Sequence, residues 1–214
     1  MTTLATMRSR IDDELLRGGT LDTQITREIV SAIKHYKRRR FWFNEGTTTS
    51  STADGTEYQD LPADLYSLDS IRITDSGDPE PLVKRHFVTI ENWCAGTVQR
   101  GMPSDWAPYK DKVRLYVCPD AVYTLTWAGI VDLGTPSADA DTSAWFEEAE
   151  ELIRQRAKAA VRINYIKDAD AIAEQRTLAM AGKPCISALE YTAFMELKRE
   201  NARRTSTGRI KAHA

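Results

Sequence analysis

The sequence predicts an α+β protein: a bundle of N- and C-terminal helices, an inserted small antiparallel β-sheet region, and an extended C-terminal tail. Three observations support this fold class. Apolar residues recur at helical spacing near both ends of the chain, the middle carries short alternating segments typical of strands, and a polar linker separates the two patterns. We therefore expect N-terminal helices of the bundle (1–40), an inserted β-rich region (41–133), C-terminal helices of the bundle (134–204) and a tail (205–214).

Two helices are expected before residue 41. The first spans residues 2–17 and ends at Gly18-Gly19, and the second begins near residues 20–22, whose side chains can cap its free N–H groups. Each helix carries one apolar stripe: Leu4, Met7, Ile11 and Leu15 on the first, and Ile25, Ile29, Ile33 and Tyr36 on the second. The second helix closes in the basic run Lys37, Arg38, Arg39 and Arg40, which suits the negative end of a helix dipole.

The β-rich region begins at Phe41-Trp42-Phe43, where helical spacing gives way to short segments divided by turn residues. Strands are expected at residues 71–73, 113–117 and 122–127, and one short helix at residues 89–96. Asp54-Gly55 favours a tight hairpin turn whose flanking segments pair. The hydroxyl-rich stretch before it, residues 47–52, is equally compatible with an exposed loop.

Helical spacing returns after the polar linker 134–143. Residues 141–143 cap a long helix whose first turns are acidic and whose later turns are basic, the order that complements the helix dipole. Another helix starts at Asp168 or Asp170 and stops at Gly182. Ser187 and Glu190 form a capping box for the last helix, which is expected to end near Arg204.

Composition excludes several classes of protein. The net charge of -2 gives no global attraction to nucleic acid or to an anionic membrane. The chain carries no long apolar run and no basic, apolar start of a signal peptide, so we expect it in the cytoplasm of the cell that makes it, with no membrane partner. Cys94, Cys118 and Cys185 lie far apart, which favours buried free thiols over disulfides or a zinc site.

No cofactor or metal site is indicated, and we expect no enzymatic activity. The three histidines lie in different segments, and no phosphate-binding loop or nucleophile elbow occurs. A cell-wall hydrolase would need only two carboxylates across a cleft, and the densest acidic cluster is Glu147, Glu148, Glu150 and Glu151. Glutamates in the first turns of a helix are also an ordinary stabilising feature, and that interpretation is preferred.

Charge is distributed unevenly along the chain. Residues 34–43 combine cations with aromatic rings, a pattern that would suit a DNA-binding module, although cations are also common at helix C-termini. Residues 115–153 contain no Lys or Arg. In a ring of identical subunits, the basic patch (37–40) and the acidic patch (147–151) could order the contacts between neighbours, or each could be solvated surface.

The C-terminal segment is strongly cationic. From residue 198 onward it contains six Lys or Arg and one acid, Glu200. A cationic extension of this kind can become ordered on a partner surface. The residues expected to make that contact are Lys198, Arg199, Arg203, Arg204, Arg209, Ile210 and Lys211.

The order of these features resembles the head-to-tail adaptor, or head-completion, proteins of tailed bacteriophages. The matching segments, over nearly the whole chain, are Arg38-Arg39-Arg40-Phe41-Trp42-Phe43-Asn44-Glu45-Gly46, Leu61-Pro62-Ala63-Asp64-Leu65, Gly101-Met102-Pro103 with Trp106 and Tyr109, Val113-Arg114-Leu115-Tyr116 with Pro119-Asp120, and Asp139-Ala140-Asp141-Thr142-Ser143-Ala144-Trp145. Position 118 is Cys where the family pattern has Pro.

The resemblance implies assembly rather than catalysis. Such adaptors combine a helical bundle with a β region, join as a ring of about twelve subunits below the portal after DNA packaging, and provide the docking platform of the tail. The implied partners are the portal protein, contacted through residues 198–214, the tail (nozzle or tail-tube) proteins, further copies of the chain, and packaged DNA through non-specific contact. The β region, including residues 47–54, would remain for neighbours or tail proteins. The implied location is the neck of the virion, and the host cytoplasm during assembly.

Overall fold

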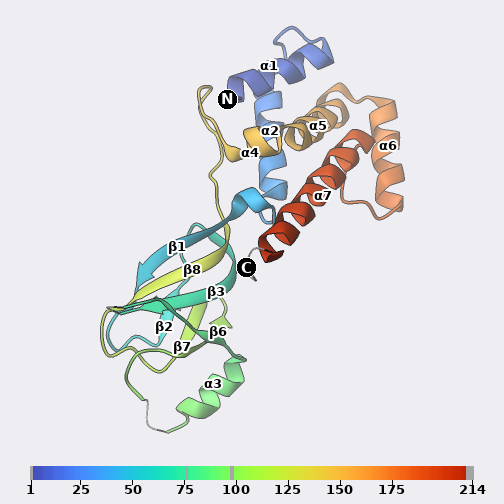
Figure 1. Ribbon diagram of the computed structural model, residues 1–214. Coiled ribbons are helices and arrows are strands. Elements are labelled where there is room, and N and C mark those ends of the chain that lie inside the picture. The colour runs from blue at the N-terminus through green and yellow to red at the C-terminus, as the bar shows by residue number, and fades with distance from the viewer. Residues whose placement is uncertain (1, 76, 97–98, 211–214) are drawn as a thin grey trace. The chain divides into compact units, whose positions relative to one another are not determined.

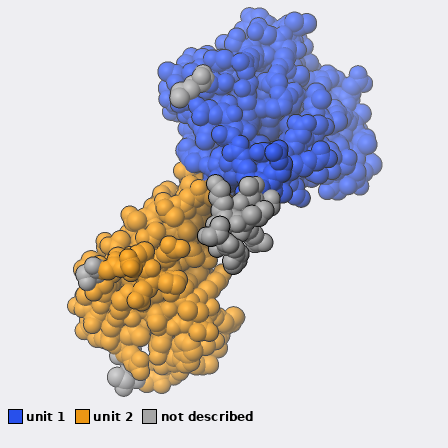
Figure 2. Space-filling model, in the orientation of Figure 1, with its two compact units in different colours: residues 1–44, 133–214 blue, residues 45–132 orange. Residues whose placement is uncertain are grey.

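The computed structural model describes residues 2–75, 77–96 and 99–210, with side chains as far as Arg204. The chain forms two compact units, shown in Figure 2: a helical unit of residues 1–44 with 133–214, and a sheet unit of residues 45–132. Helices and strands are thus segregated along the chain, and the expected α+β fold class is confirmed.

The helical unit is built from both ends of the sequence (Figure 1). Its elements are α1 (Leu4–Leu15), α2 (Asp22–Tyr36), the short 3-10 helix η1 (Trp42–Asn44), α4 (Ala144–Glu148), α5 (Glu150–Val161), the π-helical turn η2 (Arg162–Ile166), α6 (Ala169–Met180) and α7 (Ala188–Ile210). Helix α5 packs against both α2 and α7 and is the centre of the bundle.

The predicted apolar stripes form the core of this unit. Residues of α1 and α2 meet Trp145, Phe146 and the buried face of α5, and most of these side chains are almost completely buried. Each fully buried large aliphatic side chain contributes about 1.5–3 kcal/mol relative to exposure. Ala157, on the buried face of α5, also lies in this core and leaves room for a neighbouring helix to approach.

The linker between sheet unit and bundle holds the N-terminus of α1. The first N–H groups of a helix lack partners within it, and here Leu4 N donates to Asp141 O at 3.1 Å and Ala5 N to Asp139 O at 3.1 Å. The Arg8 guanidinium also donates to both carboxylate oxygens of Asp139, at 2.8 and 2.9 Å. The N-terminal helix is therefore joined to this linker by backbone and side-chain bonds.

The sheet unit contains two four-stranded sheets, ordered β1-β8-β3-β4 and β2-β7-β6-β5. Its elements are β1 (Glu45–Ser51), β2 (Tyr58–Asp60), β3 (Leu65–Thr74), β4 (Glu80–Pro81), β5 (Val83–Lys84), α3 (Phe87–Cys94), β6 (Asp105–Tyr109), β7 (Lys112–Tyr116) and β8 (Thr124–Val131). The strands pair antiparallel except β5 with β6. Trp106 and Trp127 are the largest side chains of a second core that both sheets share.

Gly129 lies where β8 and β3 approach most closely. A Cβ atom built there would stand 1.8 Å from the backbone oxygen of Ser67, so only glycine fits. The register of β3 on β8 shifts on either side of this contact, between Leu65 and Ser67 and between Leu68 and Ser70. The pairing of β3 with β8 is therefore irregular, as β-bulges make it.

Two expectations for the β-rich region are wrong. Residues 41–43 do not form a strand, because the rings of Phe41 and Phe43 pack on Trp145 of the helical unit, with centroids 5.9 and 5.0 Å away. The segments beside Asp54-Gly55 do not pair with each other, since β1 pairs with β8 and β2 with β7. Asp54-Gly55 is a turn between the two sheets.

Two expectations for the C-terminal helices also need correction. The long helix after residue 143 is interrupted at Ala149, whose φ of -130° is not helical, and this break lets Trp145, Phe146 and Ala149 all lie buried. Helix α7 continues to Ile210, so residues 205–210 are helical rather than extended. Glu200 accepts bonds from both Arg203 and Arg204, the i,i+3 and i,i+4 pairs that favour helix, and no proline or glycine intervenes before Gly208. Residues 211–214 of the expected tail lie outside the described residues.

Candidate interaction surfaces

The basic run at the end of α2 is held in a defined turn. Lys37 N–H closes the helix on Ile33 O at 2.8 Å, and Arg39 N–H donates to Tyr36 O at 2.8 Å. The completely buried Asn44 then fixes the turn, because its side chain accepts from Phe41 N at 2.8 Å and donates to Arg39 O at 2.7 Å. Sequence reasoning missed Asn44, whose only signal was a polar residue after three aromatics.

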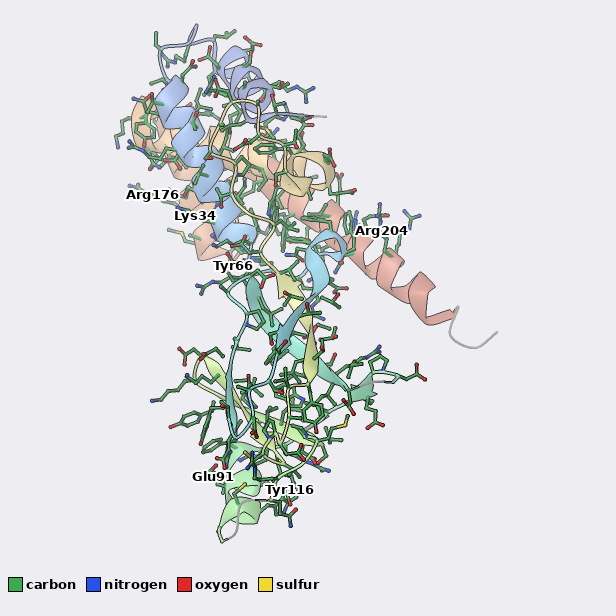
Figure 3. All side chains as sticks on the ribbon, turned by 90° about the vertical axis from the view of Figure 1, so that its left-hand side faces the viewer. Lys34, Tyr66, Glu91, Tyr116, Arg176 and Arg204 are labelled. Carbon is green, nitrogen blue, oxygen red and sulfur yellow. The ribbon has the colours of Figure 1, made fainter. Side chains whose placement is uncertain are left out.

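The cations of this run differ in their surroundings. Arg39 lies over the rings of Tyr36 and Phe194, with its guanidinium carbon 5.6 and 5.1 Å from their centroids, while Arg38 and Arg40 are exposed. Burial, together with nearby Arg156 and Arg39, lowers the pKa of His35 and keeps its ring uncharged at neutral pH. The positive charge of the basic patch therefore comes from its lysines and arginines. Lys34, labelled in Figure 3, extends it by one helical turn along α2.

The aromatic rings of the run do not form the platform that base stacking requires. Phe41 is buried, and Phe43 packs against both Phe41 and Trp145. The half-exposed Trp42 already carries a cation, because the Arg204 guanidinium carbon lies 4.4 Å from its ring centroid. The sequence favoured nucleic-acid binding because residues 34–43 combine cations with aromatic rings. In the structure most of these cations are exposed, but the rings of Phe41 and Phe43 are not available for stacking.

The four glutamates of the acidic patch lie on two helices, with different roles. Glu147 and Glu148 of α4 are exposed, whereas Glu150 bonds to Arg10 and to Thr2. Although burial opposes it, hydrogen bonds from Arg154 and Gln155 lower the pKa of Glu151. A glycosidase general acid needs a raised pKa, so the environment of Glu151 is the opposite of what that chemistry requires.

Two hollows flank helix α7 within the helical unit. The acidic hollow, with a volume of about 440 Å³, has Trp42, Glu148, Ala149, Glu150, Glu151, Leu152, Ala193, Glu196, Leu197, Glu200 and Arg204 around it. The basic hollow, of about 340 Å³, has Arg39, Arg40, Phe41, Phe194, Lys198 and Asn201. Parts of the predicted acidic and basic patches therefore each border a concave surface, on different flanks of one helix.

The start of α7 is fixed by a buried ionic network around Glu190, whose side chain is fully buried. The predicted capping box is confirmed in its first half, because Glu190 N donates to Ser187 Oγ at 3.1 Å. The Glu190 carboxylate accepts from Ile186 N at 2.6 Å, from the Arg156 guanidinium at 2.7 Å and from the Tyr36 hydroxyl. Burial and the Glu190 carboxylate raise the pKa of Tyr36, so its hydroxyl remains a donor.

The cations predicted for partner contact lie along the second half of α7. Lys198 and Arg199 are exposed, and the Arg203 side chain is 81% exposed although it donates to Glu200 at 3.0 Å. Figure 3 shows Arg204 on this helix. Arg209 and Ile210 are helical, with side chains outside the described part, and Lys211 lies outside it altogether.

The part of the chain that the structure describes contains no cluster of three or more His, Cys, Asp or Glu residues suited to a metal ion. Within the same residues, no helix combines the length and apolar character needed to cross a membrane. Cys118 and Cys185 are buried and Cys94 is half-buried, all as free thiols.

A family model described as SU10 adaptor protein matches residues 2–210, which include both units. No curated protein matches the chain.

Proposed function

Because the chain belongs to the SU10 adaptor protein family, a family of phage head-tail adaptors, we propose that it joins the portal to the tail as a ring of about twelve subunits. The ring binds beneath the portal after DNA packaging and gives the tail its docking platform. The observation that carries this proposal is the extent of the family match, which covers the helical unit, the sheet unit and α7 together.

The end of α7 is the segment proposed to bind the portal. Its first turn is anchored in the bundle by the buried Glu190, while Lys198, Arg199 and Arg203 are exposed further along the same helix. A helix held rigidly at one end presents its cations at low entropic cost to a partner that carries carboxylates. Because α7 continues to Ile210, the segment is proposed to dock on the portal as a helix rather than as an extended tail.

The sheet unit is proposed to meet the tail. Strand β1 lies at the edge of its sheet and keeps a regular register with β8 over all seven residues. Among the described residues no strand pairs with its outer side, and β1 contains no proline. Regular edges of this kind can accept a strand from another protein, whereas the opposite edge strand, β4, has only two residues and includes Pro81.

Contact with packaged DNA is proposed only as an accessory, non-specific role. Lys34, Arg38 and Arg40 are exposed cations that can approach phosphates, but Phe41 and Phe43 are not available to stack on bases. Such contact should weaken strongly as salt is raised.

The portal contact can be tested with the purified proteins. We expect the full chain to comigrate with its portal on a sizing column, and a chain lacking residues 205–214 to lose most of this binding. Substitution of exposed Lys167 by Ala, on another part of the helical unit, is a matched control that should leave binding unchanged. Undiminished binding by the truncated chain would contradict a portal contact by residues 205–214.

A further inference from the structure

We propose that neighbouring copies of the chain contact each other head to tail, with the basic flank of α7 of one copy entering the acidic hollow of the next. This proposal rests on the proposed function, because it specifies which surfaces form the ring. Unlike surfaces that meet in this way generate a closed ring when the rotation between subunits closes.

The acidic hollow has the chemistry of a site for a cationic side chain. Glu148 and Glu196 border it, are exposed, and have no hydrogen bond or ion pair with any described residue. The partly exposed Leu197 gives it apolar surface, against which the methylene stem of an arginine or lysine can pack. A long basic side chain has a charged head group that pairs with carboxylates and an apolar stem that packs on apolar surface. The acidic hollow offers both kinds of contact.

The hollow already binds one guanidinium of its own chain. Arg204 lies 4.4 Å from the centroid of Trp42, and its Nε donates to Glu200 at 2.9 Å. This cation–π contact and its flanking carboxylate do not involve Glu148 or Glu196, which have no partner among the described residues. A volume of about 440 Å³ leaves room beside Arg204 for another basic side chain.

The basic hollow, which is complementary in charge, borders a different side of α7 from the acidic hollow. Positions 193, 196, 197, 200 and 204 of α7 border the acidic hollow, whereas positions 194, 198 and 201 border the basic hollow. At about 100° per residue, these two stripes are separated by roughly 100° around the helix axis. The charges of one hollow therefore cannot neutralise those of the other within one subunit, but they can across a contact between two copies.

Charge reversal at two exposed positions of α7 tests this contact. Glu196 borders the acidic hollow and Lys198 the basic hollow, and both side chains are solvent-exposed, so neither substitution should disturb folding. Self-association of the full chain is measured at low salt by sedimentation velocity. Circular dichroism of each variant verifies its helix content.

We expect Glu196→Lys and Lys198→Glu each to weaken self-association about tenfold, because each places like charges across the contact. The chain carrying both substitutions should recover to within about threefold of the original, since both surfaces are then inverted and again complementary. Single variants that associate as the original does, or a double variant that is weaker than either single variant, would overturn the proposal.

Crosslinking identifies the direction of the contact. Chains with Glu196→Cys and chains with Lys198→Cys, distinguished by a tag, are mixed and treated with a short thiol crosslinker. Mixed crosslinks should exceed each kind of identical pair by much more than the twofold excess that random pairing gives. A statistical ratio of the three products, or a chain that stays monomeric and uncrosslinked at high concentration, would overturn it.

Portal binding, measured on the unaltered chain and on Glu196→Lys, whose position lies outside the proposed portal contact, separates this proposal from the proposed function. A chain that binds its portal but shows no charge-reversal pattern would disprove the neighbour contact alone. Failure of the unaltered chain to bind the portal would count against the proposed function itself.

Discussion

The helical unit and the sheet unit place their charges differently. In the sheet unit the Arg114 side chain, only 5% exposed, pairs with Glu57 and Glu91 and lies 4.9 Å from the centroid of Tyr58. In the helical unit, charged side chains instead border two hollows beside α7. Near α3, the exposed apolar side chains Val83, Val88, Trp93 and Tyr109 lie among exposed cations, Lys84, Arg85 and Lys110. On the proposed function, we expect the helical unit to meet its partners mainly through charge, and the sheet unit through the edge of β1 and the mixed apolar and basic surface around α3.

The largest effect is expected at Glu190, where the helical unit does bury a charge. Glu190→Ala removes the partner of Arg156 and of the Tyr36 hydroxyl, and should lower the free energy of unfolding of the helical unit by about 3 kcal/mol. Chemical denaturation, followed by helical circular dichroism, measures this loss. Exposed Glu196→Ala is the control and should change stability by less than about 0.5 kcal/mol. Equal effects of the two substitutions would contradict the anchoring role of Glu190.

A smaller effect is expected from Arg114→Ala in the sheet unit. Glu57 and Glu91 lose their common partner, but both are partly exposed and can be hydrated, so we expect a loss of about 2 kcal/mol. The loss should appear in the transition of the sheet unit, followed by near-ultraviolet circular dichroism of its tryptophans. A loss confined to the helical unit would contradict the assignment of this network to one unit.

The smallest effect is an acid-dependent loss of stability in the helical unit. The Arg8 guanidinium lowers the pKa of Asp139, and that of Arg162 lowers the pKa of Asp168. A carboxylate with a lowered pKa stabilises the fold above its ordinary pKa of about 3.9, and this contribution is lost as the pH falls through the lowered value. The temperature of thermal unfolding should therefore hardly change with pH through these groups above about pH 5, and it should fall below about pH 4. Asp139→Asn should reduce this acid dependence, and an unchanged pH profile would exclude the Arg8 contact as a contributor.

The sequence predicted elements wherever one residue pattern repeated over several turns or alternations. The stripes of α1 and α2, the strands β3, β7 and β8, the helix α3 and the cap at Ser187 are all confirmed, because each depends on local spacing. The conformation of Phe41-Trp42-Phe43 could not be predicted, since three adjacent aromatics fit either a strand or a turn. Their packing on Trp145, about a hundred residues away in the chain, decided it.

The interaction surfaces were predictable as residue types but not as shapes. The basic and acidic patches were identified from composition, whereas the hollows beside α7 bring together residues from three separated segments. Glu190 was identified as a capping residue, but its bond to Arg156 was not, because the helices that carry them meet only in the folded bundle. Charge runs indicate that a contact surface exists, and tertiary packing determines its form.

Phage particles assembled without this polypeptide test the central claim most directly. If the chain joins the portal to the tail, electron micrographs should show heads that package DNA, then lose it and carry no tails. Supplying the intact chain should restore both properties. Particles that lack the polypeptide but retain their genome and attach tails normally would contradict the account.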